Sequence, residues 1–233
     1  MKPILLDCAS FKNNNSNVSM ITFTNQEGSS IVDMLIRVIQ ENKQYLSDID
    51  GAIGDGDHGI NMNKGFTLCR EALDKDPGDL SYSLNLLGRI LMMKIGGAMG
   101  PLYGSFFRTF ALSLEGKDEI GRDDFQAALS SSVGALQIIS KASVGDKTMM
   151  DVLIPAKEAM DLAVKEDLAF GHAVDLMTEA ARRGRDSTVN MEAKIGRSAR
   201  LGTRSRGTMD AGAASCCLIL ETMASGIKEL IRE

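Results

Sequence analysis

The sequence predicts a single all-α domain, and three observations lead to this fold class. Of its 233 residues, 44% are hydrophobic but only 5% are aromatic, and Trp is absent. The core must then come from Leu, Ile, Val, Ala and 14 Met, which is typical of packed helices rather than of β-sandwiches. Apolar residues recur at helical spacing along most of the chain, and no convincing polar–apolar alternation predicts strands.

The first helix is expected to begin at Ser29 or Ser30, because either side chain would cap it. Behind it, apolar residues from Ile31 to Ile39 fall at intervals of three and four, on one face of a helix. Residues 1–28 are predicted to form a flexible tail, since they contain a polar, low-complexity run of Asn and Ser. The helical domain is therefore expected to cover residues 29–233.

Further helices are predicted wherever this apolar spacing continues between breaks rich in Gly, Pro or charge. Their approximate ranges are 61–73, 81–95, 104–114, 123–141, 149–165, 168–186 and 211–231, with a short helix at 189–195. Four loops rich in Gly and charge separate these helices. Because loops at one end of a helical scaffold can converge, the sequence predicts one functional end.

Charge and hydropathy narrow the class of protein. The net charge of -5 and the pI of about 5.2 argue against a general nucleic-acid binder, which would carry a basic face. No apolar run reaches the ~18 residues of a membrane span, and no signal peptide is recognisable. The four Cys lack metal-binding spacing and are expected to be free thiols. We therefore expect a soluble, cytoplasmic protein that binds neither nucleic acid nor membranes.

An acidic, Gly-rich segment is the strongest functional signal. Asp50, Asp55 and Asp57 lie within eight residues, and carboxylates this close repel one another unless a hard cation such as Mg²⁺ lies among them. A solvated turn with helix-capping Asp is the simpler alternative. His58 has three candidate roles: metal ligand, hydrogen-bond donor to a phosphate, or phosphorylated residue. The neighbouring carboxylates are expected to keep His58 protonated.

Two common motifs resemble this segment, and neither fits it. Residues 54–59 satisfy GxGxxG, but no hydrophobic strand precedes them and two Asp inside the turn would repel a pyrophosphate. A calcium loop starting at Asp48 would need Gly at position six and Glu at position twelve, where Ile53 and Gly59 stand. A dinucleotide fold and an EF-hand are both excluded.

Three other loops carry weaker signals. Residues 96–100 are small, which suits either close helix packing or approach of a ligand to the backbone. Residues 144–148 contain Gly-Asp-Lys-Thr, a broken P-loop that lacks the adjacent Gly-Lys and the upstream Gly. Residues 196–212 concentrate four Arg and four Gly; they form either a solvated basic loop or a phosphate-binding one.

Taken in order, these loops resemble the DhaL family, the nucleotide-binding subunit of dihydroxyacetone kinase. The resemblance covers residues 29–233, and four matching stretches carry it. They are Ile-Gly-Asp-Gly-Asp-His-Gly-Ile-Asn-Met-Asn-Lys-Gly-Phe, Gly-Gly-Ala-Met-Gly-Pro-Leu-Tyr-Gly-Ser-Phe-Phe, Gly-Asp-Lys-Thr-Met-Met-Asp-Val and Gly-Arg-x-x-x-Leu-Gly-x-Arg-Ser-x-Gly-x-x-Asp-x-Gly-Ala.

The resemblance implies an antiparallel eight-helix barrel with ADP and two Mg²⁺ at one end. It also implies a DhaM-like phosphohistidine donor that recharges ADP to ATP, and a DhaK-like subunit that holds dihydroxyacetone; a homodimer is an option. Asp50, Asp55 and Asp57 match the magnesium ligands. The residues that match nucleotide contacts are His58, Gly59, Ile60, Asn61, Ala98, Met99, Met149, Arg197, Asp210, Ala211 and Gly212. No residue of the chain is expected to act as a catalytic nucleophile.

Four departures from the family pattern concern the partner surface and the phosphoryl donor, and one of them is a shorter stretch from Ser140 to Val144. Ala211 replaces the commoner Pro, Arg200 stands where an aromatic residue is usual, and Thr203 stands where an acid is usual. Two alternatives to the phosphohistidine-dependent subunit therefore stay open. One is a kinase subunit that exchanges ATP freely and phosphorylates a triose or tetrose, and the other is a non-catalytic nucleotide-binding module.

Overall fold

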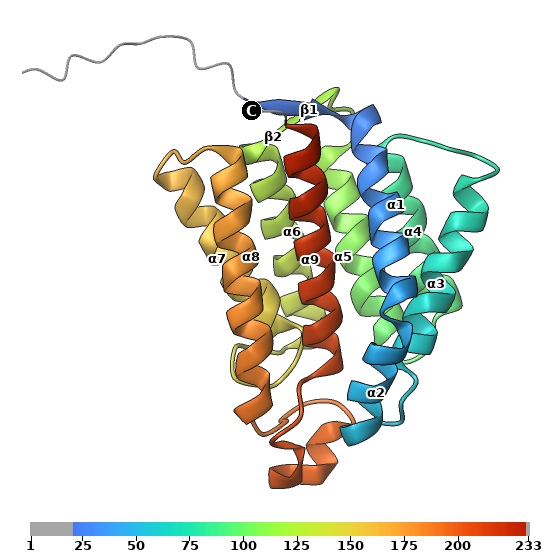
Figure 1. Ribbon diagram of the computed structural model, residues 1–233, viewed down its shortest axis with the longest axis vertical. Coiled ribbons are helices and arrows are strands. Elements are labelled where there is room, and N and C mark those ends of the chain that lie inside the picture. Colours follow the sequence, from blue (N-terminus) through green and yellow to red (C-terminus); the bar gives the residue numbers. More distant parts are fainter. Residues whose placement is uncertain (1–20, 232–233) are drawn as a thin grey trace, which may run out of the picture.

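The structure, a computed structural model, describes residues 21–231 and is built almost entirely from helices (Figure 1). The predicted all-α class is confirmed, and the closed eight-helix barrel stays a prediction. The α-helices are α1 (Asn25–Glu41), α2 (Lys43–Ile53), α3 (His58–Leu73), α4 (Leu80–Lys94), α5 (Met99–Leu114), α6 (Arg122–Ser140), α7 (Met150–Lys165), α8 (Phe170–Ser187) and α9 (Ala211–Leu230). Two 3₁₀ segments, η1 (Thr188–Asn190) and η2 (Ser198–Ser205), and two strands, β1 (Thr22–Thr24) and β2 (Glu119–Gly121), complete the described chain.

Successive long helices run in opposite directions along the axis of the molecule (Figure 1). As a result, α3, α5, α7 and α9 all begin at the same end, the bottom of Figure 1, where α2 and the η2 segment also lie. The short antiparallel pair of β1 and β2 closes the opposite end. In this arrangement four loops and four helix N-termini gather at one end of the molecule.

The interior between the helices is filled by apolar side chains. Phe66, Phe107 and Phe110 are fully buried, and the rings of Phe66 and Phe107 meet edge to face with centroids 6.0 Å apart. Each such ring removes roughly 150–250 Å² from water and stabilises the fold by a few kcal/mol. Because this core occupies the middle of the molecule, a ligand can be bound only at an end or at the surface.

The N-terminal boundary predicted from the sequence is wrong for residues 21–28. Helix α1 begins at Asn25, where Thr24 and Glu27 form a reciprocal capping box. Phe23 is buried against Phe170, and Asn25 donates a hydrogen bond to Ser81 Oγ at 2.9 Å. These contacts anchor β1 and the first turn of α1, so neither Ser29 nor Ser30 caps the helix. The rest of the predicted tail, residues 1–20, lies outside the described residues.

Three helices at the functional end also differ from the sequence prediction. Helix α2 was not expected, because its Ser, Asp and Gly residues indicate a loop; its buried Leu46 packs it against the core. Helices α3 and α5 begin earlier than predicted, at His58 and Met99. Among the described residues, no helix is long and apolar enough to cross a membrane.

Candidate functional site

A cavity of about 540 Å³ opens at the end where α3, α5, α7 and α9 begin. The first residues of these helices, His58, Met99, Met150 and Ala211, all line it. The unpaired N–H groups and the dipole of each helix N-terminus favour negative charge. Four such termini around one cavity of ligand-binding size make it suited to an anionic molecule.

One wall of the cavity is acidic. Asp50 is in the last turn of α2, Asp55 lies in the following loop, and Asp57 directly precedes α3. One carboxylate oxygen from each lies within 4.8 Å of those of the other two. Gly54 permits this approach, because a Cβ there would lie 2.4 Å from Asp50 Oδ1. The three carboxylates fit a hard divalent cation, which binds oxygen ligands.

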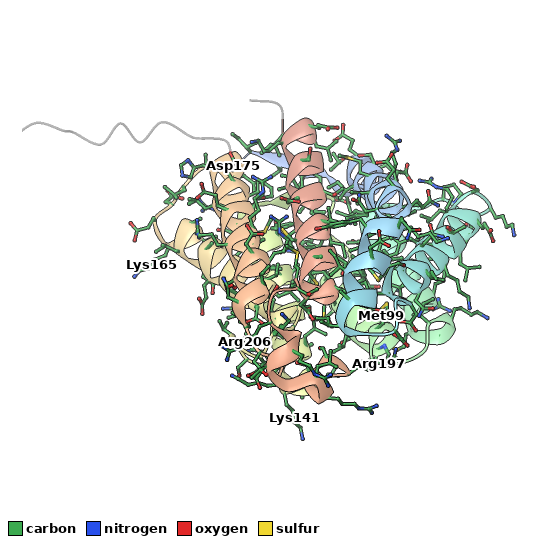
Figure 2. The ribbon with its side chains drawn as sticks, turned by 60° about the horizontal axis from the view of Figure 1, so that its bottom comes forward. Met99, Lys141, Lys165, Asp175, Arg197 and Arg206 are labelled. Atoms are coloured by element: carbon green, nitrogen blue, oxygen red, sulfur yellow. The ribbon has the colours of Figure 1, made fainter. Side chains whose placement is uncertain are left out.

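The arginine-rich segment meets this acidic wall. The Arg197 guanidinium forms an ion pair with Asp55 and lies 3.8 Å from Asp57 Oδ2. Ile195, Gly196 and Ser198 line the cavity beside Arg197, and Figure 2 shows Arg197 at the same end as Met99. Of the four arginines of residues 196–212, Arg197 lines the cavity. Arg206 instead forms an ion pair with Glu192 at 3.3 Å.

His58 directly follows Asp57 of the acidic wall, and its side chain is only 8% exposed. Its Nε2 is 2.8 Å from Ser215 Oγ, which is in turn 2.6 Å from the Tyr103 hydroxyl. Burial lowers the pKa of His58 to about 4, although the charge of Asp50 acts in the opposite direction. The prediction that the carboxylates keep His58 protonated is therefore wrong, because desolvation outweighs their attraction. A neutral imidazole is not the cationic phosphate-binding group that the sequence suggested.

Asp210 caps α9 and also lines the cavity. Its side chain accepts a hydrogen bond from Ala213 N at 2.8 Å, and its own N–H donates to Thr188 Oγ1 at 3.1 Å. Burial raises the pKa of Asp210 to about 6, whereas the Ala213 hydrogen bond and the charge of Lys147 lower it. Asp210 thus fixes the start of α9 and adds a fourth carboxyl group to the cavity.

The small residues after α4 leave backbone open to the cavity. A Cβ at Gly96 or Gly97 would meet nothing within 4 Å, and Gly97 has φ +68, so close packing does not explain this pair. Gly100 differs, because a Cβ there would lie 2.2 Å from Ile95 O. The loop therefore combines an open floor with one tightly packed glycine.

The structure brings most of the sequence-predicted site residues to this cavity. The residues that line it are Asp50, Asp55, Asp57, His58, Asn61, Ala98, Met99, Met149, Arg197, Asp210, Ala211 and Gly212. Gly59 and Ile60 do not line it: Gly59 packs against α2, and Ile60 is 53% exposed. The assignment of individual metal and nucleotide contacts stays a prediction.

Several residues of the site were not among those predicted from the sequence, and four of them have polar side chains that the structure connects to the site. Tyr103 and Ser215 support His58 from below, and Lys147 and Thr148 line the cavity beside Met149. Lys147 and Thr148 belong to the Gly-Asp-Lys-Thr loop, so a signal was present there. Tyr103 belongs to one of the four stretches that carry the family resemblance, whereas Ser215 lies in an apolar helical pattern and carried no signal of its own.

The chemistry of these walls is specific. Carboxylates alone would repel a polyphosphate, but carboxylates that hold divalent cations attract it, and helix N-termini and Arg197 neutralise the remaining charge. Apolar side chains such as Leu102 and Met149 complete the lining and suit a flat heterocycle. The cavity therefore fits a nucleotide polyphosphate with its cations.

Comparison with known proteins supports this interpretation. The model of the DAK2 domain family matches residues 52–225. The ADP-binding subunit DhaL of PEP-dependent dihydroxyacetone kinase 2 from Listeria innocua is 36% identical over 201 residues, covering 83% of this chain and 91% of that protein. The DhaL subunit of the Escherichia coli PEP-dependent enzyme is 33% identical over 208 residues, covering 86% of this chain and 98% of that protein.

A solved structure has the same fold. The dihydroxyacetone kinase from C. freundii, in complex with AMP-PNP and Mg²⁺, superposes with a TM-score of 0.65 at 21% sequence identity. The match covers 97% of this chain and 38% of that one, and at this identity it shows the fold alone. With the family match over residues 52–225, the chain belongs to the DAK2 domain family, together with the DhaL subunits of dihydroxyacetone kinases.

Proposed function

We propose that this chain is the ADP-binding phosphotransferase subunit of a dihydroxyacetone kinase. It takes a phosphoryl group from a DhaM-like phosphohistidine protein through bound ADP/ATP and two Mg²⁺. It passes this group to dihydroxyacetone on a DhaK-like subunit. The observation that carries the proposal is that the acidic cluster of Asp50, Asp55 and Asp57 and four helix N-termini line one cavity. A homodimer stays a prediction.

In this proposal the protein works by positioning and charge. Asp50, Asp55 and Asp57 would hold the Mg²⁺ ions, whose bound charge neutralises phosphoryl oxygens. The N–H groups that begin α3, α5, α7 and α9 orient the polyphosphate, and Arg197 donates charge-assisted hydrogen bonds to it. Neutral His58, whose ring is hydrogen-bonded to Ser215, lines the cavity next to these groups. No covalent step on the protein is required.

A second candidate function follows from another group of relatives. D-erythrulose kinase of Mycolicibacterium smegmatis is 36% identical over 203 residues, which is 82% of this chain but 34% of that protein. This similarity supports an ATP-dependent kinase subunit acting on a triose or tetrose as the alternative. The two functions differ in how long the nucleotide stays bound.

Nucleotide residence separates these candidates. The protein is purified, desalted and denatured, and the released nucleotide and metal are identified. ADP retained at about one per chain, together with phosphoenolpyruvate-dependent labelling of dihydroxyacetone by DhaM-like and DhaK-like partners, is the expected result. Nucleotide lost on desalting, with transfer sustained by free ATP and no phosphohistidine protein, would favour the alternative.

A paired substitution tests catalysis itself. Asp55→Ala with Asp57→Ala is expected to abolish transfer, whereas Asp175→Ala should not change it. Asp175 is an exposed carboxylate at the opposite end of the molecule and pairs with Lys228 (Figure 2). If the doubly substituted protein still binds nucleotide and still supports transfer, the acidic cluster does not hold the metal ions of the proposed reaction, and the observation that carries the proposal is lost.

A further inference from the structure

A buried lysine, Lys147, lines the cavity and feels the charge of Asp210, but the hydrogen bonds described for it go to backbone carbonyls and not to a carboxylate. Lys147 is 1% exposed, and its three N–H groups point at three backbone carbonyls. Nζ lies 2.7 Å from Thr188 O, 3.3 Å from Met191 O and 2.5 Å from Thr208 O. An ammonium has three donors and no acceptor, so this arrangement satisfies it completely. Removing it would leave three carbonyls of the buried site without their charged partner.

The three carbonyls flank the stretch of chain that carries Arg197, two before it and one after it. Thr188 and Met191 lie where the chain leaves α8, and Thr208 lies where it returns to α9. The stretch between them carries Arg197 to the acidic cluster and contributes Ile195 and neighbouring residues to the cavity wall. One ammonium therefore joins both ends of the segment that borders the cavity, at the bottom of Figure 1.

Few residues of the segment are buried, and its other contacts are mainly polar: Ala193 N donates to Ser205 Oγ at 2.9 Å, and Gly207 N donates to Val189 O at 2.7 Å. From Lys194 to Arg206, Ser205 is the single buried residue. Positive φ angles at Gly196, Gly202 and Gly207 give the backbone points at which it can bend. A segment with so few buried apolar contacts opens at low free energy, so its position depends on polar contacts at its ends.

Lys147 itself is held firmly on the α7 side. The Asp151 carboxylate accepts hydrogen bonds from Gly145 N at 2.5 Å and from Thr148 N at 2.7 Å. Lys147 adopts φ +62, a backbone conformation that costs energy for a residue other than Gly. This local arrangement directs a rigidly mounted ammonium at the ends of the weakly packed segment.

We propose that Lys147 is a positioning residue that holds both ends of the segment 191–208, keeps Arg197 at the acidic cluster and so slows release of the nucleotide. The inference rests on the proposed nucleotide-binding function for its effect on release. The restraint on the segment is independent of the ligand. Lys147 acts through Arg197 and has no contact of its own with the acidic cluster among the described residues.

The test compares Lys147→Met with Lys194→Met, a lysine of the same segment whose side chain is 62% exposed and pairs with Asp146. Release of a fluorescent ADP analogue in Mg²⁺ is followed by stopped flow. Lys147→Met should release it about tenfold faster or more, because hydrogen bonds to a charged group are lost, while Lys194→Met should stay within about twofold.

A double-mutant cycle with Arg197→Gln shows whether Lys147 works through Arg197. Lys147→Met should accelerate release much less in the Arg197→Gln background than in the wild type. Equal acceleration in both backgrounds would indicate general loosening of the fold and would overturn the positioning role.

A second readout needs no nucleotide. Trypsin should cut after Arg200, Arg204 and Arg206 faster in Lys147→Met than in the wild type, at equal melting temperature. If the wild type does not bind the ADP analogue but this difference in cleavage is found, the proposed function fails and the restraint stands. If Lys147→Met releases the ADP analogue and is cleaved by trypsin at the same rates as the wild type, the inference is wrong and the proposed function is unaffected.

If Lys147→Met does not fold, amide hydrogen exchange of the wild type tests whether Lys147 restrains the segment. The amides of Lys194 and Gly207, which donate to Asp146 O and Val189 O, are then followed together with those of Gly145 and Thr148. Exchange of all four through one common opening supports the restraint. Opening of the arginine-rich segment independently of residues 145–148 contradicts it.

Discussion

Arg197 forms an ion pair with Asp55 across the mouth of the cavity, so a protein cation already faces the carboxylates proposed to bind metal. Its guanidinium is also 3.8 Å from Asp57 Oδ2. A divalent ion held by these carboxylates and a guanidinium paired with them compete for the same oxygens. When metal and polyphosphate bind, we expect Arg197 to exchange its carboxylate partners for phosphate oxygens.

Arg197→Gln should therefore affect two binding constants in opposite directions. Affinity for Mn²⁺ alone should rise by up to about fivefold, because an exposed ion pair that competes with the ion is worth at most about 1 kcal/mol. Affinity for ADP with Mg²⁺ should fall by about tenfold or more, because charge-assisted hydrogen bonds to phosphate are lost. Electron paramagnetic resonance measures free Mn²⁺, and calorimetry measures ADP. Arg206→Gln removes the same charge from the same segment and should change neither; a fall in both affinities for Arg197→Gln would exclude competition.

Asp55→Asn combined with Asp57→Asn should remove metal-dependent stabilisation by nucleotide. A ligand present at 100 times its Kd stabilises the native state by about 2.7 kcal/mol, which appears as a rise in melting temperature. We expect this rise with ADP and Mg²⁺ in the wild type and none in the variant. Without ligand the melting temperature of the variant should stay close to that of the wild type, since the relief of repulsion between two carboxylates offsets the loss of the exposed Arg197–Asp55 ion pair. Asp48→Asn, an exposed position of α2 that pairs with Gln44, should keep the full rise.

The long helices were predictable because their apolar residues repeat at helical spacing over four or more turns. The ends were harder, because caps and loops depend on single side chains. The Thr24–Glu27 capping box was visible as Thr-x-x-Glu, but the polar run before it favoured a tail. Helix α2 was missed because Ser, Asp and Gly disfavour helices locally, whereas tertiary packing of Leu46 stabilises this one.

The site divides in the same way. Three close carboxylates predicted a cation from their charge alone, without knowledge of the fold. The burial of His58 and the contacts of Lys147 depend on segments that are distant in the sequence: Ser215 for His58, and Thr188 and Thr208 for Lys147. No local pattern encodes such a pairing, so the protonation of His58 could not be predicted and the role of Lys147 was missed.

The raised pKa of Asp210 predicts a pH dependence of stability. Its folded-state pKa is about 6, whereas the ordinary value is 3.8, so the native state holds its proton more tightly than the unfolded chain does. The stabilisation is complete below about pH 4 and is lost as pH rises to about 6, a loss on the order of 3 kcal/mol. Relative to the wild type, Asp210→Asn should therefore gain stability between pH 4 and 7, while still capping α9. Urea unfolding in chelator measures this difference; parallel pH profiles of the two proteins would contradict it.

Gly59 tests whether every residue of the acidic segment serves the ligand. The resemblance to the DhaL family implied that Gly59 contacts the nucleotide. In the structure, a Cβ at this position would lie 1.9 Å from Lys43 O and 2.8 Å from Ser47 N. The clash is with backbone, which cannot rotate away, so α2 and α3 would have to separate. Gly59→Ala should lower the free energy of unfolding by about 1–3 kcal/mol. Gly134→Ala on α6 is the matched control, because its Cβ would meet nothing within 4 Å and should stabilise the helix by up to about 1 kcal/mol. We expect Gly59→Ala to lose stability and nucleotide affinity together, because displacement of α2 also moves Asp50. If nucleotide affinity falls at unchanged stability, Gly59 contacts the ligand and is not a packing residue.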